Sequence, residues 1–205
     1  MARDRSPIVK QSRREGYALH PKAHKIMLRR TTIPGEHGQG RRSKPSGYSL
    51  QLREKQKVRR LYGLLEKQFS NLMKESNRSS GQSGQILLQL LERRLDNAVY
   101  RAGFATSRRG ARQLVGHGHF MLNGRRVDIP SIRMNEGDEL VVRPKSASNE
   151  YFKQLADIST ASSQPKLGWL TSDVKKMTIK ITGVPSREEA EPDINEQLIV
   201  EFYSR

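Results

Sequence analysis

Arginines gather in both halves of one short segment, "TSRRGARQLVGHGHFMLNGRRV", which runs from Thr106 to Val127. A guanidinium group presents a planar fork of donors that matches the oxygens of a phosphate or a carboxylate. The segment contains no acidic residue, so these side chains are suited to binding an anionic partner. Such binding requires a backbone that brings the two arginine groups together.

The first half of the segment has the pattern of a short amphipathic helix. Ser107 is a favourable N-cap residue. Apolar residues recur after it at helical spacing, at Ala111, Leu114 and Val115. The arginines fall on an adjacent face, at Arg108, Arg109 and Arg112. We expect Arg108 and Arg112 to face solvent, and we expect Gly116 and Gly118 to end the helix, because glycine tolerates the left-handed backbone of a helix terminus.

The second half of the segment predicts a β-hairpin. Asn123-Gly124 is a strong signal for a two-residue type I′ turn. The glycine corner would fold this hairpin back toward the helix, so that Arg125 and Arg126 share one surface with Arg108 and Arg112. Such a surface can contact two phosphate strands.

The whole chain is strongly basic, with 38 Lys and Arg against 21 Asp and Glu and a formal charge of +17. By segment the charge is +13 in residues 1–60, +6 in residues 61–145 and −2 in residues 146–205. Self-repulsion disfavours a compact chain of this charge unless a polyanion neutralises it. We expect nucleic acid or an anionic membrane surface to bind the first 145 residues. With only 6% aromatics, phosphate and shape recognition of folded RNA is favoured over base stacking on single strands.

Several other classes of function lack support in the sequence. No run approaches the roughly 18 apolar residues of a membrane span, and the N-terminus lacks the apolar region of a secretory signal. The absence of cysteine suits a reducing compartment. His20 and His24 have i, i+4 spacing, but Pro21 lies between them and no third metal ligand is evident. We therefore expect a soluble protein with no metal and no cofactor.

The N-terminal part of the chain predicts helices. Residues 1–47 have the composition of an irregular basic arm with room for a short helix. Helical spacing then predicts two helices, about 49–62 and 64–76. A Ser/Gly-rich joint at 76–84 precedes a long apolar helix that ends at Gly103 and is expected to connect two domains.

The C-terminal part predicts strands. Residues 176–184 and 197–204 alternate apolar and polar side chains, as paired strands do. The fold class is therefore α+β: a mostly helical first domain with a basic N-terminal arm and a C-terminal strand pair, plus an RNA-binding module of two helices packed on a small twisted antiparallel sheet.

A second group of basic residues lies in "REKQKVRR", in the first of the two predicted helices. These residues are Arg53, Lys55, Lys57, Arg59 and Arg60. A solvated helix face is the ordinary interpretation of such a run. The positive charge of the run is more than Glu54 can neutralise, which favours phosphate contact instead.

The segment "ERRLDNAVYRAGFATSRRGARQLVGHGHFMLNGRRVDIPS" resembles the family of small-subunit ribosomal protein four, whose central module is shared by several RNA-binding proteins. The likeness extends to "LQLREKQKVRRLYGLLEKQF", to "PGEHG" in the basic arm and to the ending "INEQLIVEFYSR". It therefore covers nearly the whole chain.

The resemblance implies a primary rRNA-binding protein that binds the 5′ domain of small-subunit rRNA and nucleates assembly of the subunit. It further implies contacts with small-subunit ribosomal protein five and with mRNA where it enters the subunit. Members of the same family also influence decoding accuracy, and in some bacteria they repress their own mRNA. The implied location is the ribosome, in the cytoplasm or an organelle matrix.

The resemblance also implies that the C-terminal strands return to the first domain and leave the module as an insertion. The expected division is an arm at 1–47, a helical domain at 48–92 completed by 155–205, and the module at 93–154. The predicted RNA-binding residues are Arg3, Arg5, Arg13, Arg14, Arg41, Arg42, Lys44, Arg53, Lys55, Lys57, Arg59, Arg60, Ser107, Arg108, Arg109, Arg112, Gln113, His117, His119, Arg125 and Arg126. The chain departs from many relatives at Asp4 and Ser6, and it lacks the zinc-binding cysteines that some relatives carry in the arm.

An enzyme is the competing interpretation, because the same module is appended to pseudouridine synthases whose catalytic aspartate lies in an "RLD" triplet. Arg94-Leu95-Asp96 repeats those letters. Asp96 falls in the predicted amphipathic helix, however, where helix pairing or contact with a strand is the expected role. The chain has no separate domain to form a catalytic cleft. We therefore expect no enzyme, with a free-standing RNA-binding protein or a synthase fragment as the alternatives.

Overall fold

The computed structural model describes residues 4, 6–40, 44–162 and 167–204. The chain divides into two compact units. The first unit comprises Met1–Leu87 together with Asp193–Arg205, and the second comprises Leu88–Pro192. In the described part of the chain, no helix combines the length and the hydropathy needed to cross a bilayer.

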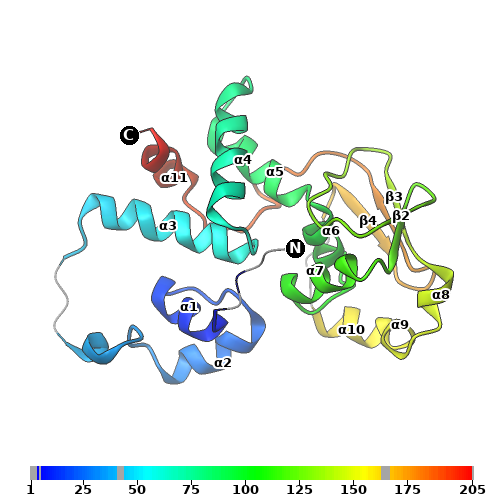
Figure 1. Cartoon of the computed structure of the whole chain (residues 1–205), viewed down its shortest axis with the longest axis horizontal. Coiled ribbons are helices and arrows are strands. Elements are labelled where there is room, and N and C mark those ends of the chain that lie inside the picture. Colours follow the sequence, from blue (N-terminus) through cyan, green and yellow to red (C-terminus); the bar gives the residue numbers. More distant parts are fainter. Residues whose placement is uncertain (1–3, 5, 41–43, 163–166, 205) are drawn as a thin grey trace. The chain divides into compact units, whose positions relative to one another are not determined.

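The first unit is helical (Figure 1). Its elements are α1 (Ile8–Glu15), α2 (Pro21–Arg29), a 3-10 turn η1 (Glu36–Gln39), α3 (Gly47–Leu61), α4 (Glu66–Arg78), the first half of α5 (Ser83–Glu92) and α11 (Glu196–Tyr203). The arm, predicted to be irregular with room for one short helix, thus contains two α-helices. Local signals account for them: Gly16 ends α1 at φ 67°, and the side chain of His20 caps α2 by accepting from the N–H of Lys22.

The predicted C-terminal strand at 197–204 is wrong, because this segment forms α11 and packs against α3. Leu198, Ile199 and Val200 are consecutive apolar residues, and such a run fits either a strand or a buried helix. The helix buries Ile199 completely and leaves Val200 only partly buried. The packing of α11 therefore overrides the local alternation.

The second unit packs helices on an antiparallel sheet (Figure 1). The helices are the second half of α5, α6 (Leu95–Arg101), α7 (Arg108–Gly116), α8 (Pro144–Ala147), α9 (Glu150–Lys153) and α10 (Leu155–Ser162). The strands are β1 (Phe120–Leu122), β2 (Arg125–Val127), β3 (Glu139–Val142), β4 (Leu170–Asp173) and β5 (Thr178–Ile181), in the order β2-β1-β3-β5-β4. Its core includes Leu95, Val115, Phe120, Trp169 and Ile179. The α+β class is confirmed.

The predicted long helix is interrupted at Arg94, so α5 and α6 are separate helices. Arg94 adopts an extended backbone and forms a β-bridge with Arg133. The N–H of Leu95 donates to the carbonyl of Ile132, and the N–H of Met134 donates to the carbonyl of Arg93. Hydrogen bonds to a distant loop thus replace those that a continuous helix would make.

The division of the chain also differs from the one expected. Residues 155–192 lie in the second unit rather than completing the first, and only Asp193–Arg205 return. The reason is strand pairing, since β5 lies beside β3 with Leu140 opposite Ile179. The sheet is therefore larger than a module ending at residue 154 would contain.

Candidate nucleic-acid interface

The helix α7 forms as its sequence predicts. The Ser107 hydroxyl accepts from the N–H of Gly110 at 3.2 Å and caps the helix. Ala111 and Val115 are fully buried. On the exposed side, one stripe follows i, i+4 spacing through Arg109, Gln113 and His117, all of which are solvent-exposed.

Arg108 and Arg112 do not face solvent as expected. The Arg108 guanidinium donates to Oδ1 of Asn97 at 2.9 Å and to Oε1 of Glu191 at 2.7 Å, and it lies over the ring of Tyr100. Arg112 Nη1 donates to Oδ2 of Asp96 at 3.0 Å. Only 12% and 13% of the two side chains is exposed. Acids inside the unit already occupy both arginines, so the interpretation as solvent-facing residues is wrong.

Asp96 is the centre of one buried network. Its Oδ1 accepts from Arg94 Nε and from the N–H of Asn97, both at 3.0 Å. Its Oδ2 accepts from Arg94 Nη2 at 2.9 Å and from Arg112. These four hydrogen bonds saturate a buried carboxylate. The aspartate of the "RLD" triplet therefore has a structural role.

Glu92 is the centre of a second buried network. Its carboxylate accepts two hydrogen bonds from Arg101, at 2.9 and 2.8 Å, and one from Asn97 Nδ2 at 2.6 Å. Glu191 lies 3.6 Å from Arg101 and joins this network to Arg108. The two networks fix α6 and the N-terminal end of α7 and thereby orient the exposed stripe.

The glycine corner brings the hairpin to the end of this stripe. Gly118 has φ 69°, and a Cβ built there would lie 2.8 Å from the guanidinium nitrogens of Arg126. The Arg126 side chain thus packs on the corner directly after His117. Leu122 pairs with Arg125 across the turn, and both hairpin arginines are exposed. We call the set Arg109, Gln113, His117, Arg125 and Arg126 the α7–hairpin surface.

His119 lies beside this surface and is only partly exposed. Its Nδ1 is 3.0 Å from the hydroxyl of Ser146, and its ring packs on Phe152. Burial, together with the neighbouring His117 and Arg143, lowers the pKa of His119. Arg143, which is not among the predicted RNA-binding residues, donates to the carbonyl of Gly118 at 3.0 Å and so holds the glycine corner.

The basic helix α3 uses most of its charge inside the first unit. Arg53 and Arg60 donate to the buried carboxylate of Glu15. Lys55 is buried, donates to Glu66 at 2.7 Å and lies 4.5 Å from the ring centre of Phe202. Lys57 donates to the carbonyl of Asp193 at 2.6 Å, and Arg59 donates to Gln56 and to the carbonyl of Leu64. The run predicted to contact phosphate is thus largely occupied by intramolecular partners.

The predicted RNA-binding residues of the arm differ in their partners and in their exposure. Arg13 donates to the carbonyl of Thr32. Arg14 donates to the carbonyl of Pro34 and remains exposed, and Lys44 is exposed. Four further predicted residues lie outside the described ones: Arg3, Arg5, Arg41 and Arg42.

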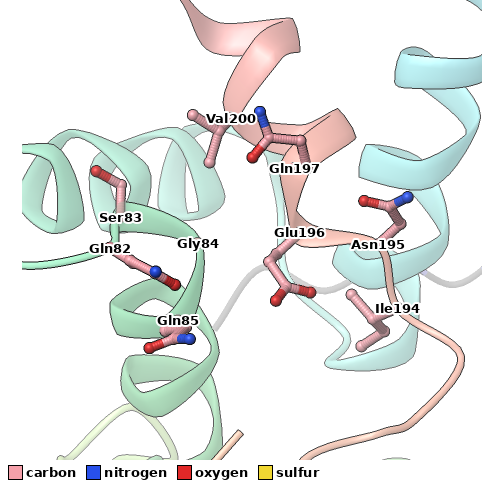
Figure 2. Close-up of a pocket in the computed structure, with 9 residues that line it drawn as sticks. All are labelled: Gln82, Ser83, Gly84, Gln85, Ile194, Asn195, Glu196, Gln197 and Val200. Atoms are coloured by element: carbon pink, nitrogen blue, oxygen red, sulfur yellow. The ribbon is translucent and has the colours of Figure 1, made fainter.

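A hollow of about 590 Å³ in the first unit lies between the N-terminal ends of α5 and α11 (Figure 2). Amide and hydroxyl side chains line it together with Ile194 and Val200, and Glu196 is the one charged residue among the described residues of the lining. A Cβ on Gly84 would lie 2.7 Å from Cγ of Glu196, so glycine permits this close approach. With no cationic side chain among these described lining residues, the hollow does not suit a phosphate. Among the described residues, no group of His, Asp or Glu is arranged to hold a metal ion.

Comparisons with known proteins show which family the chain belongs to. Residues 3–92 match the family described as "Ribosomal protein S4/S9 N-terminal domain", and residues 93–140 match the "S4 domain". Proteins named "Small ribosomal subunit protein uS4" from Chloroflexus aurantiacus, Clostridioides difficile and Thermus thermophilus are 48%, 49% and 48% identical to this chain. Each alignment covers 100% of both sequences. The chain therefore belongs to the uS4 family of small ribosomal subunit proteins.

Proposed function

We propose that this chain is a structural constituent of the small ribosomal subunit that binds the 5′ domain of its rRNA, chiefly through the α7–hairpin surface. The observation that carries the proposal is the continuity of that surface, in which Arg126 packs on Gly118 at the end of the stripe formed by Arg109, Gln113 and His117. Arginines presented by a rigid helix and hairpin suit recognition of folded RNA through phosphates and shape. Family membership supports the same role, which is structural and not enzymatic.

The proposal includes the finer functions that the family implies. Binding of the 5′ domain would nucleate assembly of the subunit in the cytoplasm or an organelle. Contacts with small-subunit ribosomal protein five and with mRNA where it enters the subunit would contribute to decoding accuracy. Repression of its own mRNA would use the same RNA-binding residues.

Affinity for two RNAs tests the proposal. We expect a transcript of the 5′ domain to bind about a thousandfold more tightly at physiological salt than an unrelated folded RNA of equal length. Near-equal affinities would favour a free-standing, non-specific RNA-binding protein instead.

A pair of charge variants tests the surface itself. Arg125→Gln with Arg126→Gln should weaken binding of the 5′-domain transcript at least tenfold, because both residues are exposed on the proposed interface. The control is Lys175→Gln with Lys176→Gln, which removes the same charge from an exposed turn at the opposite edge of the sheet. Equal losses in the two variants would contradict the assignment of the α7–hairpin surface.

A further inference from the structure

The glycine corner that joins α7 to the hairpin, residues 116–119, has a backbone that bends easily. Gly116 and Gly118 lie on either side of His117, and Gly118 has φ 69°. Glycine has no Cβ and therefore adopts more backbone conformations than other residues. The angle between α7 and the hairpin thus depends on contacts that the rest of the unit makes with this corner. The continuity of the α7–hairpin surface depends on the same contacts.

A short segment directly after β3 supplies such contacts. The backbone N–H of Arg143 donates to the carbonyl of His119 at 2.9 Å, and Nη1 of the same arginine donates to the carbonyl of Gly118 at 3.0 Å. The hydroxyl of Ser146 lies 3.0 Å from Nδ1 of His119. Three polar contacts therefore hold two adjacent residues of the corner. We call residues 143–146 the corner clamp.

The corner clamp is itself anchored in the sheet and the core. It follows Val142, which is buried and pairs with Phe120 of β1. The N–H groups of Ser146 and Ala147 donate to the carbonyl of Arg143 at 2.8 and 2.9 Å, in the turn that begins α8. Ser146 is only 5% exposed. A segment fixed in this way can restrain a more flexible neighbour.

Gly118 connects the corner clamp to an arginine of the α7–hairpin surface. Its carbonyl accepts from Arg143, and its N–H donates to the carbonyl of Val115 at 2.8 Å. The guanidinium of Arg126 packs against it, since a Cβ there would lie 2.8 Å from the guanidinium nitrogens. A displacement of Gly118 would therefore move the support on which Arg126 rests.

We propose that Arg143 and Ser146 are positioning residues for RNA recognition, which fix the angle between α7 and the hairpin without contacting RNA themselves. This inference rests on the proposed function and identifies what pre-organises its surface. Groups that are ordered before they bind avoid part of the entropic cost of association. A direct phosphate contact fits these two residues less well, because Arg143 Nη1 donates to a carbonyl of the protein and Ser146 is buried and uncharged.

Ser146→Ala separates positioning from direct contact, because it removes a buried hydroxyl and no charge. We expect this variant to bind the 5′-domain transcript about three- to tenfold more weakly, in line with one lost hydrogen bond. Its slope of log K against log salt should equal that of the wild type. The control is Ser148→Ala, whose hydroxyl is exposed and donates to the carbonyl of Lys145. Wild-type affinity in Ser146→Ala, or an equal loss in the control, would overturn the proposal.

Arg143→Ala also removes a charge, so the salt dependence of its RNA binding is decisive. We expect a loss of affinity of about three- to tenfold with the wild-type slope. A slope shallower by about 0.7 to 0.9 would show that Arg143 binds a phosphate, and would overturn the proposal. Melting temperatures establish that each variant is folded at the temperature of the binding assay.

A double-mutant cycle tests whether the corner clamp acts through the hairpin arginine. In an Arg126→Gln background, Arg143→Ala should cause a smaller loss of RNA affinity than it causes in the wild type, because the guanidinium that it positions is gone. Losses that add in full would contradict a positioning role for Arg143.

Amide hydrogen exchange tests the corner clamp in the full chain without RNA. Exchange at Gly118 and His119 should be faster in Arg143→Ala than in the wild type, because the corner opens more often, while exchange in α4 should stay unchanged. Lys145→Ala, which removes an exposed charge from the same segment, should match the wild type. Unchanged exchange in Arg143→Ala would overturn the restraint on which the proposal depends.

The exchange rates also distinguish the two possible failures. If the wild-type chain does not prefer the 5′-domain transcript while the exchange rates change as expected, the proposed function fails and the restraint by Arg143 stands. If the chain prefers this transcript but Arg143→Ala and Ser146→Ala bind it like the wild type, the proposed function stands and the positioning role fails.

Discussion

The partner of each arginine, more than its place in the sequence, decides what it can bind. Arg108 and Arg125 look alike in the sequence, yet Arg108 is held by Glu191 and Asn97 while Arg125 is exposed. Glu191 is 83 residues away from Arg108 along the chain, so no local pattern links them. The arginines paired inside the fold orient α7, whereas Arg125 and Arg126 are exposed on the hairpin.

The first prediction concerns Asp96. Asp96→Asn removes the charge that Arg94 and Arg112 share in a buried setting. Leaving buried cations without their counter-charge should lower the free energy of unfolding by about 3 kcal/mol. Urea denaturation measures the loss. The exposed Asp128 supplies the control, Asp128→Asn. A loss no larger than that of the control would show that Asp96 does not hold the network together.

The second prediction concerns the pH dependence of stability through His119. Because the folded state lowers the pKa of this side chain, the unfolded chain binds a proton more readily. The free energy of unfolding should therefore fall as the pH drops below about 6.5, the pKa of an unperturbed histidine. Urea denaturation between pH 7 and pH 5 should show a smaller loss in the free energy of unfolding for His119→Gln than for the wild type. His24→Gln on α2, where the side chain is exposed, should keep the wild-type profile, and an unchanged profile in His119→Gln would refute the assignment.

At the scale of elements, Gly84 permits the close approach of α5 and α11. A methyl group there would lie 2.7 Å from Cγ and 2.9 Å from Cβ of Glu196. Gly84→Ala should therefore lower the free energy of unfolding by about 1 to 3 kcal/mol, the range for overpacked sites. Gly47→Ala is the control, because its methyl group meets nothing within 4 Å. Equal free energies of unfolding for the two variants in urea would mean that α11 moves away from α5 without a loss of stability.

Elements specified by neighbouring residues could be predicted from the sequence. The Ser107 cap, the end of α7 at its glycines and the Asn123-Gly124 turn all form as expected. Both turn residues have positive φ, 48° and 79°, as a type I′ turn requires. The α7–hairpin surface could therefore be outlined from these local signals, although Arg108 and Arg112 had to be removed from it.

Elements specified by distant partners could not be predicted. The backbone break at Arg94 depends on residues 132–134, and the place of β5 depends on β3. The helical state of α11 depends on its packing against α3. In each case the deciding contact joins segments far apart in the sequence, where local periodicity carries no information.

At the scale of the whole molecule, a formal charge of +17 overstates what an RNA would meet. In α3, α6 and α7, ion pairs already neutralise Arg60, Arg101 and Arg112, for example. Among the residues that the structure describes, the exposed Lys and Arg members of the predicted set are fewer: Arg14, Lys44, Arg109, Arg125 and Arg126. With the exposed Lys10 there are six such described cations, and we expect about six phosphate contacts from them.

This number predicts the salt dependence of RNA binding. Six neutralised phosphates should give a slope near −5 for log K against log salt, since each contributes about −0.9 on duplex nucleic acid. Filter binding of the 5′-domain transcript between 50 and 300 mM salt measures it. A slope shallower than about −2 would mean that the exposed cations are not used. A slope steeper than about −9 would mean that buried arginines exchange their acids for phosphates. The paired residues Arg108 and Arg112 would then bind RNA after all, through a rearrangement of the Glu92 and Asp96 networks.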